Sequence, residues 1–429
     1  MKISEVNTLQ LKEDLSRLYG EYEKYKSMNL DLNISRGLPC KEQLDLNAEM
    51  FHVLEEEDCI HEDGTDYRNY GVMYGIPECI KLFSDLLDIP EKNIILGGES
   101  CLNLMYDQMM RYYVFGSLGE EPWSVQARSR KLKWLCPVPG YDCHFSLTEA
   151  LGFDMINIPL LDDGPDMDLV EELVSKDPDI KGIWCVPQYS NPTGVVYSDQ
   201  VVDRLAKMKT AAPDFKIMWD NAYAVHHLYR ENKVKDLLKE SAKYDNENRV
   251  LYFFSTAKIT FPGSGVCLVA SGDRSIEETK QLLKLQIFSH DKLNQLRHVK
   301  YLKSPENIIH HMKEIAAILR PRFDLVDRLL QENRLYEDAY TWFKPDGGYF
   351  ITVESYEGCA EKILNMVEEA GVKVATPAST YPYHKDPKDT TIRLAPTYPP
   401  VDELRTAVTL FCICANLVCA EKVLGERLI

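Results

Sequence analysis

The sequence lacks several features by which common classes of protein are identified. Its 429 residues carry 49 Lys and Arg against 67 Asp and Glu, which gives a net charge of −18. Such a chain lacks the basic surface that neutralises phosphates, so we expect no nonspecific binding to nucleic acid. No Gly-x-Gly-x-x-Gly follows the first predicted strand, which argues against a simple dinucleotide-binding protein.

Apolar runs of membrane-spanning length are also missing. The first 28 residues are polar and helix-like, without the apolar core of a secretory signal. The longest apolar stretch, residues 407–420, is interrupted by Thr409 and Asn416. It predicts a buried helix that is too short to cross a bilayer, so we expect no membrane association.

Paired cysteines are absent as well. The twelve cysteines are scattered and none forms a Cys-x-x-Cys motif. This distribution predicts reduced, mostly buried thiols in a cytoplasmic protein, and it predicts no metal site.

What is present indicates a globular α/β protein with more than one small core. The chain is 45% hydrophobic and 27% charged, which is ordinary for a globular protein. Strand-like and helix-like segments alternate from about residue 90 to 290, which predicts a mainly parallel sheet with helices on both faces. The predicted strands are 93–96, 133–138, 180–186, 215–219, 250–254 and 266–270, and the clearest helices are 100–113 and 198–209.

The pattern changes near residue 306. A long helix over 306–330 precedes a turn and strand at 343–353, a helix at 360–370, strands at 372–375 and 391–394, and a C-terminal helix. This order predicts a second, smaller α+β domain. We expect a large domain over residues 51–305 and a small domain formed by residues 1–50 and 306–429.

Four polar side chains follow the predicted strands in a chemically suggestive order. They are Asn191 in Asn-Pro-Thr-Gly, Asp220 and Tyr223 in Asp-Asn-Ala-Tyr, and Lys258 in Ser-Thr-Ala-Lys. A lysine amine can form a Schiff base with an aldehyde, and a carboxylate beside a pyridine nitrogen favours its protonated form. A phenol and an amide can both bind the ring's 3-oxygen. Together these groups can hold and use pyridoxal 5′-phosphate (PLP).

Each motif alone has a simpler interpretation. A lysine in a loop is usually solvated, Asn-Pro-x-Gly is usually a turn, and an Asp after a strand is usually a helix N-cap. In open α/β sheets, however, ligands bind beyond the carboxyl ends of the strands. Several motif segments fall at such ends, which favours a single site. They are 97–101, 139–144, 191, 220 and 255–258.

With these motifs, the chain resembles the fold type I PLP-dependent aminotransferases of class I/II. It is most similar to the bacterial aspartate aminotransferase branch that is related to the aminotransferase-like domain of MocR regulators. The resemblance extends from Ile-Ser-Arg-Gly-Leu-Pro at 34–39 to Thr-Ile-Arg-Leu-Ala-Pro at 391–396. It implies ping-pong transfer of an amino group from an amino acid to a 2-oxo acid, with L-aspartate and 2-oxoglutarate as the first expectation.

The resemblance also implies roles around the cofactor ring. Lys258 carries the Schiff base and moves the substrate's Cα proton, and Asp220 pairs with the pyridine nitrogen. His144 supports that aspartate, although a buried histidine bound to the backbone is an alternative. Tyr141 stacks on the ring.

Further roles concern the 3-oxygen and the substrate. Asn191 and Tyr223 match the ligands of the 3-oxygen, and Asn191 also borders the substrate. Arg393 matches the arginine that binds the α-carboxylate, because its planar donors suit that group. A surface ion pair is the simpler alternative for an arginine at a strand end.

The phosphate is expected at a helix start. Glu99, Ser100 and Cys101 open a predicted helix whose amides suit an anion, and Ser255 adds a hydroxyl. Tyr70 matches a tyrosine that reaches the phosphate of a neighbouring subunit, which implies a homodimer with shared active sites. Many relatives carry an arginine shortly after the lysine, but residues 262–266 contain no cation.

A dicarboxylate substrate needs a second cation. The candidates are Arg36 in the first motif, where Gly37 is also expected to border the substrate, and Lys292 or Arg297 in the segment 291–298. An ordinary charged helix face is the alternative for that segment, and the sequence does not choose among them.

Two other functions share these motifs. The same residues serve a PLP-dependent β-lyase or decarboxylase, since one scaffold supports several reactions. A PLP-sensing regulator would carry a DNA-binding domain before this core. Only about thirty residues precede Asn33, so this second alternative is not favoured.

Overall fold

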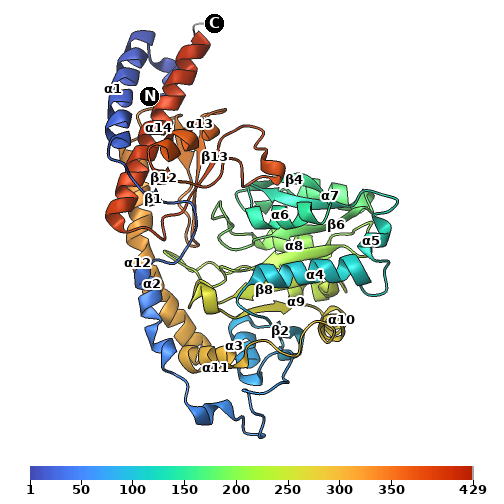
Figure 1. Cartoon of the computed structure of the whole chain (residues 1–429). Helices are drawn as coiled ribbons and strands as arrows, with labels where there is room; N and C mark the ends of the chain where they lie inside the picture. The colour runs from blue at the N-terminus through green and yellow to red at the C-terminus, as the bar shows by residue number, and fades with distance from the viewer. Residues whose placement is uncertain (428–429) are drawn as a thin grey trace.

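The computed structural model describes residues 1–427 and is built around one eight-stranded sheet (Figure 1). The strands lie in the order β2-β9-β8-β7-β6-β3-β4-β5. Their bounds are β2 Ile94–Leu96, β3 Lys133–Val138, β4 Asp154–Leu161, β5 Gly164–Pro165, β6 Ile180–Cys185, β7 Lys216–Asp220, β8 Val250–Ser255 and β9 Cys267–Ala270.

The sheet is mostly parallel, as the sequence predicts. Strands β4, β3, β6, β7 and β8 pair in parallel, whereas β9 is antiparallel to both of its neighbours, β2 and β8. Helices cover both faces (Figure 1), so the predicted α/β fold class is confirmed. The helices are α1 Thr8–Lys26, α2 Lys41–Leu46, α3 Pro77–Leu87, α4 Cys101–Phe115, α5 Trp123–Gln126, α6 Asp142–Ala150, α7 Met167–Lys176, α8 Asp199–Lys207, α9 Leu237–Ala242, α10 Asp273–Leu283, α11 Lys292–Leu302, α12 Pro305–Glu332, α13 Ala360–Glu369 and α14 Val401–Arg427.

A second group of elements lies beside the large sheet. Strands β10 (Tyr340–Trp342), β11 (Ile351–Ser355) and β13 (Thr391–Leu394) form an antiparallel sheet. The N-terminal segment joins this group, because β1 (Leu32–Asn33) pairs with β12 (Val372–Lys373) and α1 packs on α14. Both chain ends therefore lie in this group of elements, and the division into a large and a small domain, with boundaries at residues 50 and 305, stays a prediction.

Helix α14 corrects one expectation. It spans 27 residues, and by length and composition it could cross a membrane, so the inference that the apolar stretch is too short is wrong. The helix extends well beyond residues 407–420 on both sides. However, 78% of its most apolar window is buried, and it packs against α1, α12 and α13. The prediction of a buried core helix is confirmed.

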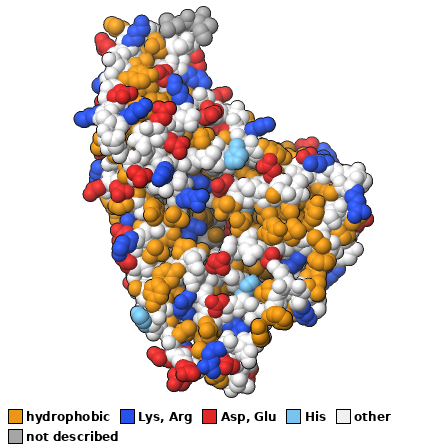
Figure 2. Space-filling model, viewed as in Figure 1, with side chains coloured by type: hydrophobic (Ala, Val, Ile, Leu, Met, Phe, Trp, Pro, Cys, Tyr) orange, Lys and Arg blue, Asp and Glu red, His pale blue; other side chains and the backbone are white. Residues whose placement is uncertain are grey.

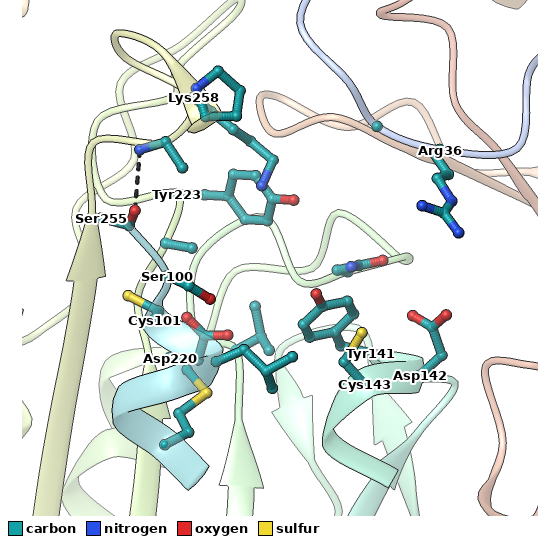
Figure 3. A pocket seen from close by; sticks show the side chains of 18 of the residues that line it. Arg36, Ser100, Cys101, Tyr141, Asp142, Cys143, Asp220, Tyr223, Ser255 and Lys258 are labelled. Atoms are coloured by element: carbon teal, nitrogen blue, oxygen red, sulfur yellow. Dashed lines mark hydrogen bonds between the residues drawn. The ribbon is translucent and has the colours of Figure 1, made fainter. Parts of the chain in front are cut away.

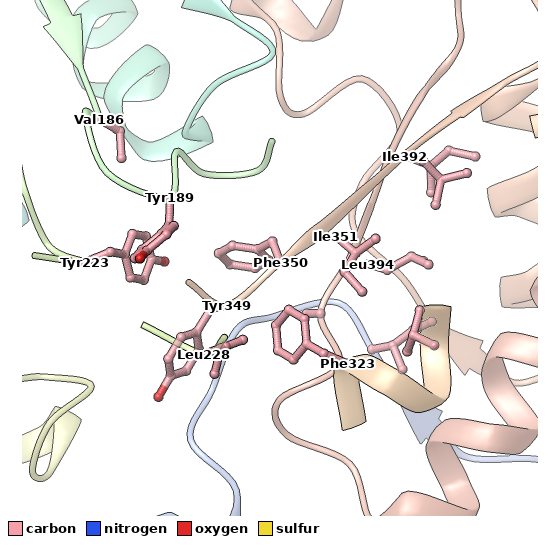
Figure 4. Close-up of a cluster of buried hydrophobic side chains, with 14 of the residues drawn as sticks. Val186, Tyr189, Tyr223, Leu228, Phe323, Tyr349, Phe350, Ile351, Ile392 and Leu394 are labelled. Carbon is pink, nitrogen blue, oxygen red and sulfur yellow. The ribbon is translucent and has the colours of Figure 1, made fainter. Parts of the chain in front are cut away.

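The register of the sheet aligns the strand ends that carry the motifs. Cys185 of β6 pairs with Trp219 of β7, and Asp220 pairs with Phe253 of β8. Three consecutive strands therefore end at one edge, and the segments that follow them project toward the second group of elements. Figure 4 shows Tyr189 and Tyr223 from this edge facing Tyr349 and Phe350, which lead into β11.

Candidate active site

A cavity of about 460 Å³ lies at this edge (Figure 3). That volume is typical of a site for a cofactor with a small substrate. The lining includes twelve of the residues that the sequence identified, which are Arg36, Gly37, Glu99, Ser100, Cys101, Tyr141, Asn191, Asp220, Tyr223, Ser255, Lys258 and Arg393.

Lys258 extends into this cavity from the loop that follows β8. Its Nζ lies 5.2 Å from the ring centre of Tyr223 and 5.6 Å from that of Tyr349. Burial lowers the pKa of the Lys258 amine, and the negative charge of Asp220 opposes that shift. A larger fraction of the amine is therefore neutral than in water, and the neutral amine is the form that attacks a carbonyl carbon.

The loop itself is held by a small hydrogen-bond network. Thr256 Oγ1 accepts from the Val266 amide at 2.9 Å and lies 3.1 Å from His298 Nε2. Ser255 Oγ accepts from the Ala257 amide at 3.0 Å. These contacts fix the turn that directs Lys258 into the cavity.

Asp220 is buried at the end of β7 with one oxygen paired and one free. Oδ2 lies 3.1 Å from His144 Nε2, and the His144 ring stacks on Trp184 at 4.1 Å between ring centres. Oδ1 is buried and has no hydrogen-bond partner within residues 1–427. An unpaired buried carboxylate oxygen is costly, so this atom suits a cationic N–H group of a bound ligand.

His144 therefore lies behind Asp220 and not on the cavity wall. Its side chain is 1% exposed, and its partner is the carboxylate and not a backbone group. The arrangement agrees with the supporting role implied by the resemblance.

Two phenols border the space above Asp220. Burial raises the pKa of both Tyr141 and Tyr223 well above the ordinary value, so both side chains are neutral hydrogen-bond donors at physiological pH. Tyr141 contacts the edge of His144, with ring centres 4.9 Å apart.

The other end of the cavity suits an anion. Helix α4 begins here with Ser100 as its N-cap, and Cys101 is its first residue. Free amides of the first turn and the hydroxyls of Ser100 and Ser255 meet at this end (Figure 3). The segment 262–265 contributes Pro262 to the lining and no cation, so amides and hydroxyls are the donors available for a phosphate.

Arg393 projects from β13 into the opposite side of the cavity. Its Nη1 donates to Oδ1 of Asp142 at 3.3 Å and to Oδ1 of Asn191 at 3.5 Å. The guanidinium lies 5.0 Å from the ring centre of Phe350, and its buried Nε has no partner among the described residues. Donors thus remain for a carboxylate.

Arg36 and Gly37 line the cavity from the segment after β1. The Arg36 side chain is directed toward Asp142 in Figure 3. Gly37 lies against Phe350, since a Cβ at this position would come within 2.6 Å of the Phe350 Cζ. A larger residue at this position would have to push the Phe350 ring aside.

Three other candidates lie outside the cavity lining. Tyr70 is 81% exposed and contacts Phe288. Arg297 Nη2 donates to Ser264 and Asn294. Lys292 is buried and donates to Ser289 Oγ at 2.9 Å.

Sequence reasoning missed Asp142, Phe350 and Trp184. Asp142 and Phe350 line the cavity, and Trp184 supports His144. Asp142 and Trp184 fall inside or beside segments that the sequence singled out, at 139–144 and 180–186. A signal for them was present, but their contacts depend on side-chain directions that spacing alone does not give.

Comparisons with known proteins agree with this site. A family model described as aspartate amino-transferase matches residues 6–427. An aspartate aminotransferase of Corynebacterium glutamicum is 40% identical over 411 residues, which cover 95% of this chain and 94% of that protein.

Solved structures show the same architecture. The crystal structure of an aspartate transaminase from Corynebacterium glutamicum superposes with a TM-score of 0.95 at 38% identity, covering 98% of this chain and 99% of that one. An α-aminoadipate aminotransferase from Thermus thermophilus, complexed with N-(5′-phosphopyridoxyl)-L-leucine, shares the fold with a TM-score of 0.73 at 16% identity, covering 99% and 96%. The chain belongs to the aspartate aminotransferase family and is an aminotransferase of PLP-dependent fold type I.

Proposed function

We propose that this aminotransferase moves the amino group of L-aspartate to 2-oxoglutarate and that its cofactor is PLP. The observation that carries the cofactor is the free Oδ1 of Asp220 in the same cavity as Lys258. PLP supplies an aldehyde that exchanges amines and a ring that accepts electrons from the substrate's Cα.

The residues divide the work according to position. Asp220, braced by His144 and Trp184, binds the protonated pyridine nitrogen. Tyr141 covers the ring, and Asn191 and Tyr223 bind the 3-oxygen. Lys258 holds the cofactor and then carries the proton that leaves the substrate's Cα, a task that suits an amine with a lowered pKa.

The phosphate and the substrate occupy opposite ends. Ser100, Ser255 and the amides after Glu99 bind the phosphate, with Cys101 at the first helical position. Arg393 binds the α-carboxylate through the donors that its neighbours leave free.

For the distal carboxylate we favour Arg36. Of the candidates, Arg36 lines the cavity together with Gly37, whereas Arg297 and Lys292 bond to side chains elsewhere. Two guanidinium groups in one cavity suit a dicarboxylate such as aspartate or 2-oxoglutarate.

The absorption spectrum of the purified protein tests this proposal. We expect a visible cofactor band that disappears on addition of L-aspartate alone and returns with 2-oxoglutarate. A band that ignores aspartate but responds to another amino acid would reject the substrate and keep the cofactor. No band after incubation with PLP would reject the cofactor assignment.

We further propose that the protein is a homodimer with shared active sites. Helix α4 presents Leu102 and Tyr106 beside an open groove of about 650 Å³, which Glu99, Ser100 and Cys143 connect to the cavity. Figure 2 shows apolar side chains gathered on this face. Exposed Tyr70 and Phe288 add apolar surface, and such a patch is typical of an interface between protein chains.

Sedimentation velocity tests the dimer. We expect a dimer for the wild type, and we expect Phe288→Asp to shift it toward monomer and to weaken PLP binding, because Tyr70 contacts Phe288. A monomeric wild type with full activity would contradict shared sites.

The twelve unpaired thiols support a reducing, cytoplasmic location.

A further inference from the structure

Asp142 is a carboxylate of the cavity lining for which the transfer reaction supplies no role. Asp142 is the first residue of α6 and follows Tyr141 directly. Its side chain is 33% exposed and faces the same space as the two arginines. It pairs with Arg393, the group that the substrate's α-carboxylate needs.

The contact between Asp142 and Arg393 is a single one. Only Nη1 reaches Asp142, at 3.3 Å, whereas a strong arginine–carboxylate pair has two parallel bonds. The Arg393 side chain is 8% exposed, and its Nε has no partner within residues 1–427. The pair therefore neutralises a buried charge without using the full set of donors.

Arg36 points toward the same carboxylate. Figure 3 shows its guanidinium above the Asp142 carboxylate. The positive charges of both Arg393 and Arg36 act on the neighbouring Cys143 thiol, where they oppose the rise in pKa that burial causes. Asp142 thus contacts one of the two cations proposed to bind a dicarboxylate and faces the other.

We propose that Asp142 is a specificity-determining residue that competes with the substrate's carboxylates for Arg393 and Arg36. This inference rests on the proposed function. A bound dicarboxylate brings two negative charges close to Asp142, whereas a monocarboxylate brings one. The repulsion between like charges inside a half-buried cavity therefore weakens dicarboxylates more strongly than monocarboxylates.

The test is the substitution Asp142→Asn, which keeps the shape of the side chain and removes its charge. Binding of an unreactive dicarboxylate, maleate, and of a monocarboxylate, propionate, is measured by calorimetry on the cofactor-loaded protein. We expect the Kd for maleate to fall roughly tenfold and that for propionate by no more than about threefold. The KM for aspartate is expected to fall in parallel, with a smaller effect on kcat.

The matched control is Asp199→Asn. Asp199 is likewise the first residue of its helix, α8, but it is exposed and lies outside the cavity lining. The substitution therefore removes the same charge from the same helix position, and we expect the Kd values for maleate and propionate to stay within twofold of the wild type. Asp142→Ser provides a second variant if Asp142→Asn does not fold.

Each outcome is decisive. A Kd for maleate that stays within twofold, or that rises, overturns the competition, and a rise would mean that Asp142 orients Arg393 for binding. An equal gain for maleate and propionate overturns the discrimination. Failure of the proposed substrates is seen separately, as absence of wild-type turnover with aspartate, because the carboxylate binding is measured without turnover.

Discussion

Individual side chains in this cavity carry separable tasks. Lys258 is the only amine on its wall among the described residues, while Arg36 and Arg393 supply permanent charges. In Asp220, one carboxylate oxygen pairs with His144 and the other has no partner among the described residues. The chemistry thus depends on an amine whose lowered pKa lets it gain and lose a proton.

Replacing Lys258 by Ala removes that amine. We expect turnover to fall by more than about a thousandfold, because both the covalent attachment and the proton transfer are lost. A steady-state transamination assay measures the loss, and circular dichroism checks the fold. Lys209→Ala, an exposed lysine outside the cavity, serves as control, and sustained turnover by Lys258→Ala would contradict the mechanism.

Replacing Gly37 by Ala tests whether the close approach of this residue to Phe350 matters for substrate binding. In Gly37→Ala the new Cβ meets Phe350 at 2.6 Å and displaces the ring that lies under Arg393. We expect the KM for aspartate to rise by about tenfold or more, since a small displacement of a carboxylate-binding group is costly.

The control for Gly37→Ala is Gly20→Ala. Gly20 lies inside α1 with open space around it, and alanine favours the helix by about 0.5–1 kcal/mol. We expect a small gain in melting temperature and no change in KM. Equal KM values for the two variants would remove Gly37 from the site.

The segments that join strands to helices position these side chains. Thr256, at the end of β8, ties the Lys258 loop to Val266 and to His298 of α11. Similarly, α4 and α6 both begin at the cavity, so their first turns provide its anion-binding amides and Asp142.

Thr256→Val tests the loop network. The variant leaves the buried Val266 amide without its side-chain acceptor, which costs about 1–3 kcal/mol of stability. Chemical denaturation is expected to show this loss together with faster dissociation of PLP. Thr256→Ser keeps the hydroxyl and should behave like the wild type. Loss of the same size in both variants would point to packing of the methyl group instead.

Much of this arrangement of elements was predictable from the sequence. Strands β6, β7 and β8, which lead to Asn191, Asp220 and Lys258, are short and mostly apolar runs, because a strand covered on both faces disfavours polar side chains. Strand β4 was missed because it lies near the edge and alternates, and because Pro159 interrupts its pattern. The antiparallel direction of β9 leaves no trace in its composition.

The part of the site that lies at strand ends was predictable from the same apolar runs, whereas the contacts between its side chains were not. The segments at strand ends were assigned to one edge, and the cavity contains them. The partners of Arg393 were not predictable, since Asp142 lies 251 positions away and its direction depends on the packing of α6. The positions of Tyr70 and Arg297 outside the cavity lining were not predictable either, because they depend on contacts between surface and loop segments.

The whole molecule responds to pH through buried histidines. Burial lowers the pKa of His226 to about 3 and that of His298 to about 4, from 6.5. Both therefore remain neutral in the folded protein at pH values where the unfolded chain binds protons. Stability is fully present above pH 6.5 and is lost as the pH falls toward the folded values, by about 1.4 kcal/mol per pH unit for each histidine.

His226→Leu isolates one of these groups. Neither ring nitrogen of His226 makes a hydrogen bond of ordinary geometry in the described part of the chain, so an apolar replacement loses only weak contacts of the ring with the backbone of Lys258 and Tyr223. Between pH 7 and pH 5 we expect the variant to lose about 2 kcal/mol less unfolding free energy than the wild type. Urea denaturation at both pH values measures this difference, and identical pH dependence would show that His226 is not the group responsible.

Helix α12 is long enough that a small tilt at one end causes a large displacement at the other. Its 28 residues extend over about 42 Å, at about 1.5 Å per residue, from contacts with α3 and α11 to contacts with α14. A tilt of only about 5° at one end displaces the other by almost 4 Å. Arg393 lies on the three-stranded sheet, whereas Lys258 follows a strand of the eight-stranded sheet, so we expect a few degrees of tilt of α12 to take the arginine out of reach of a substrate's carboxylate.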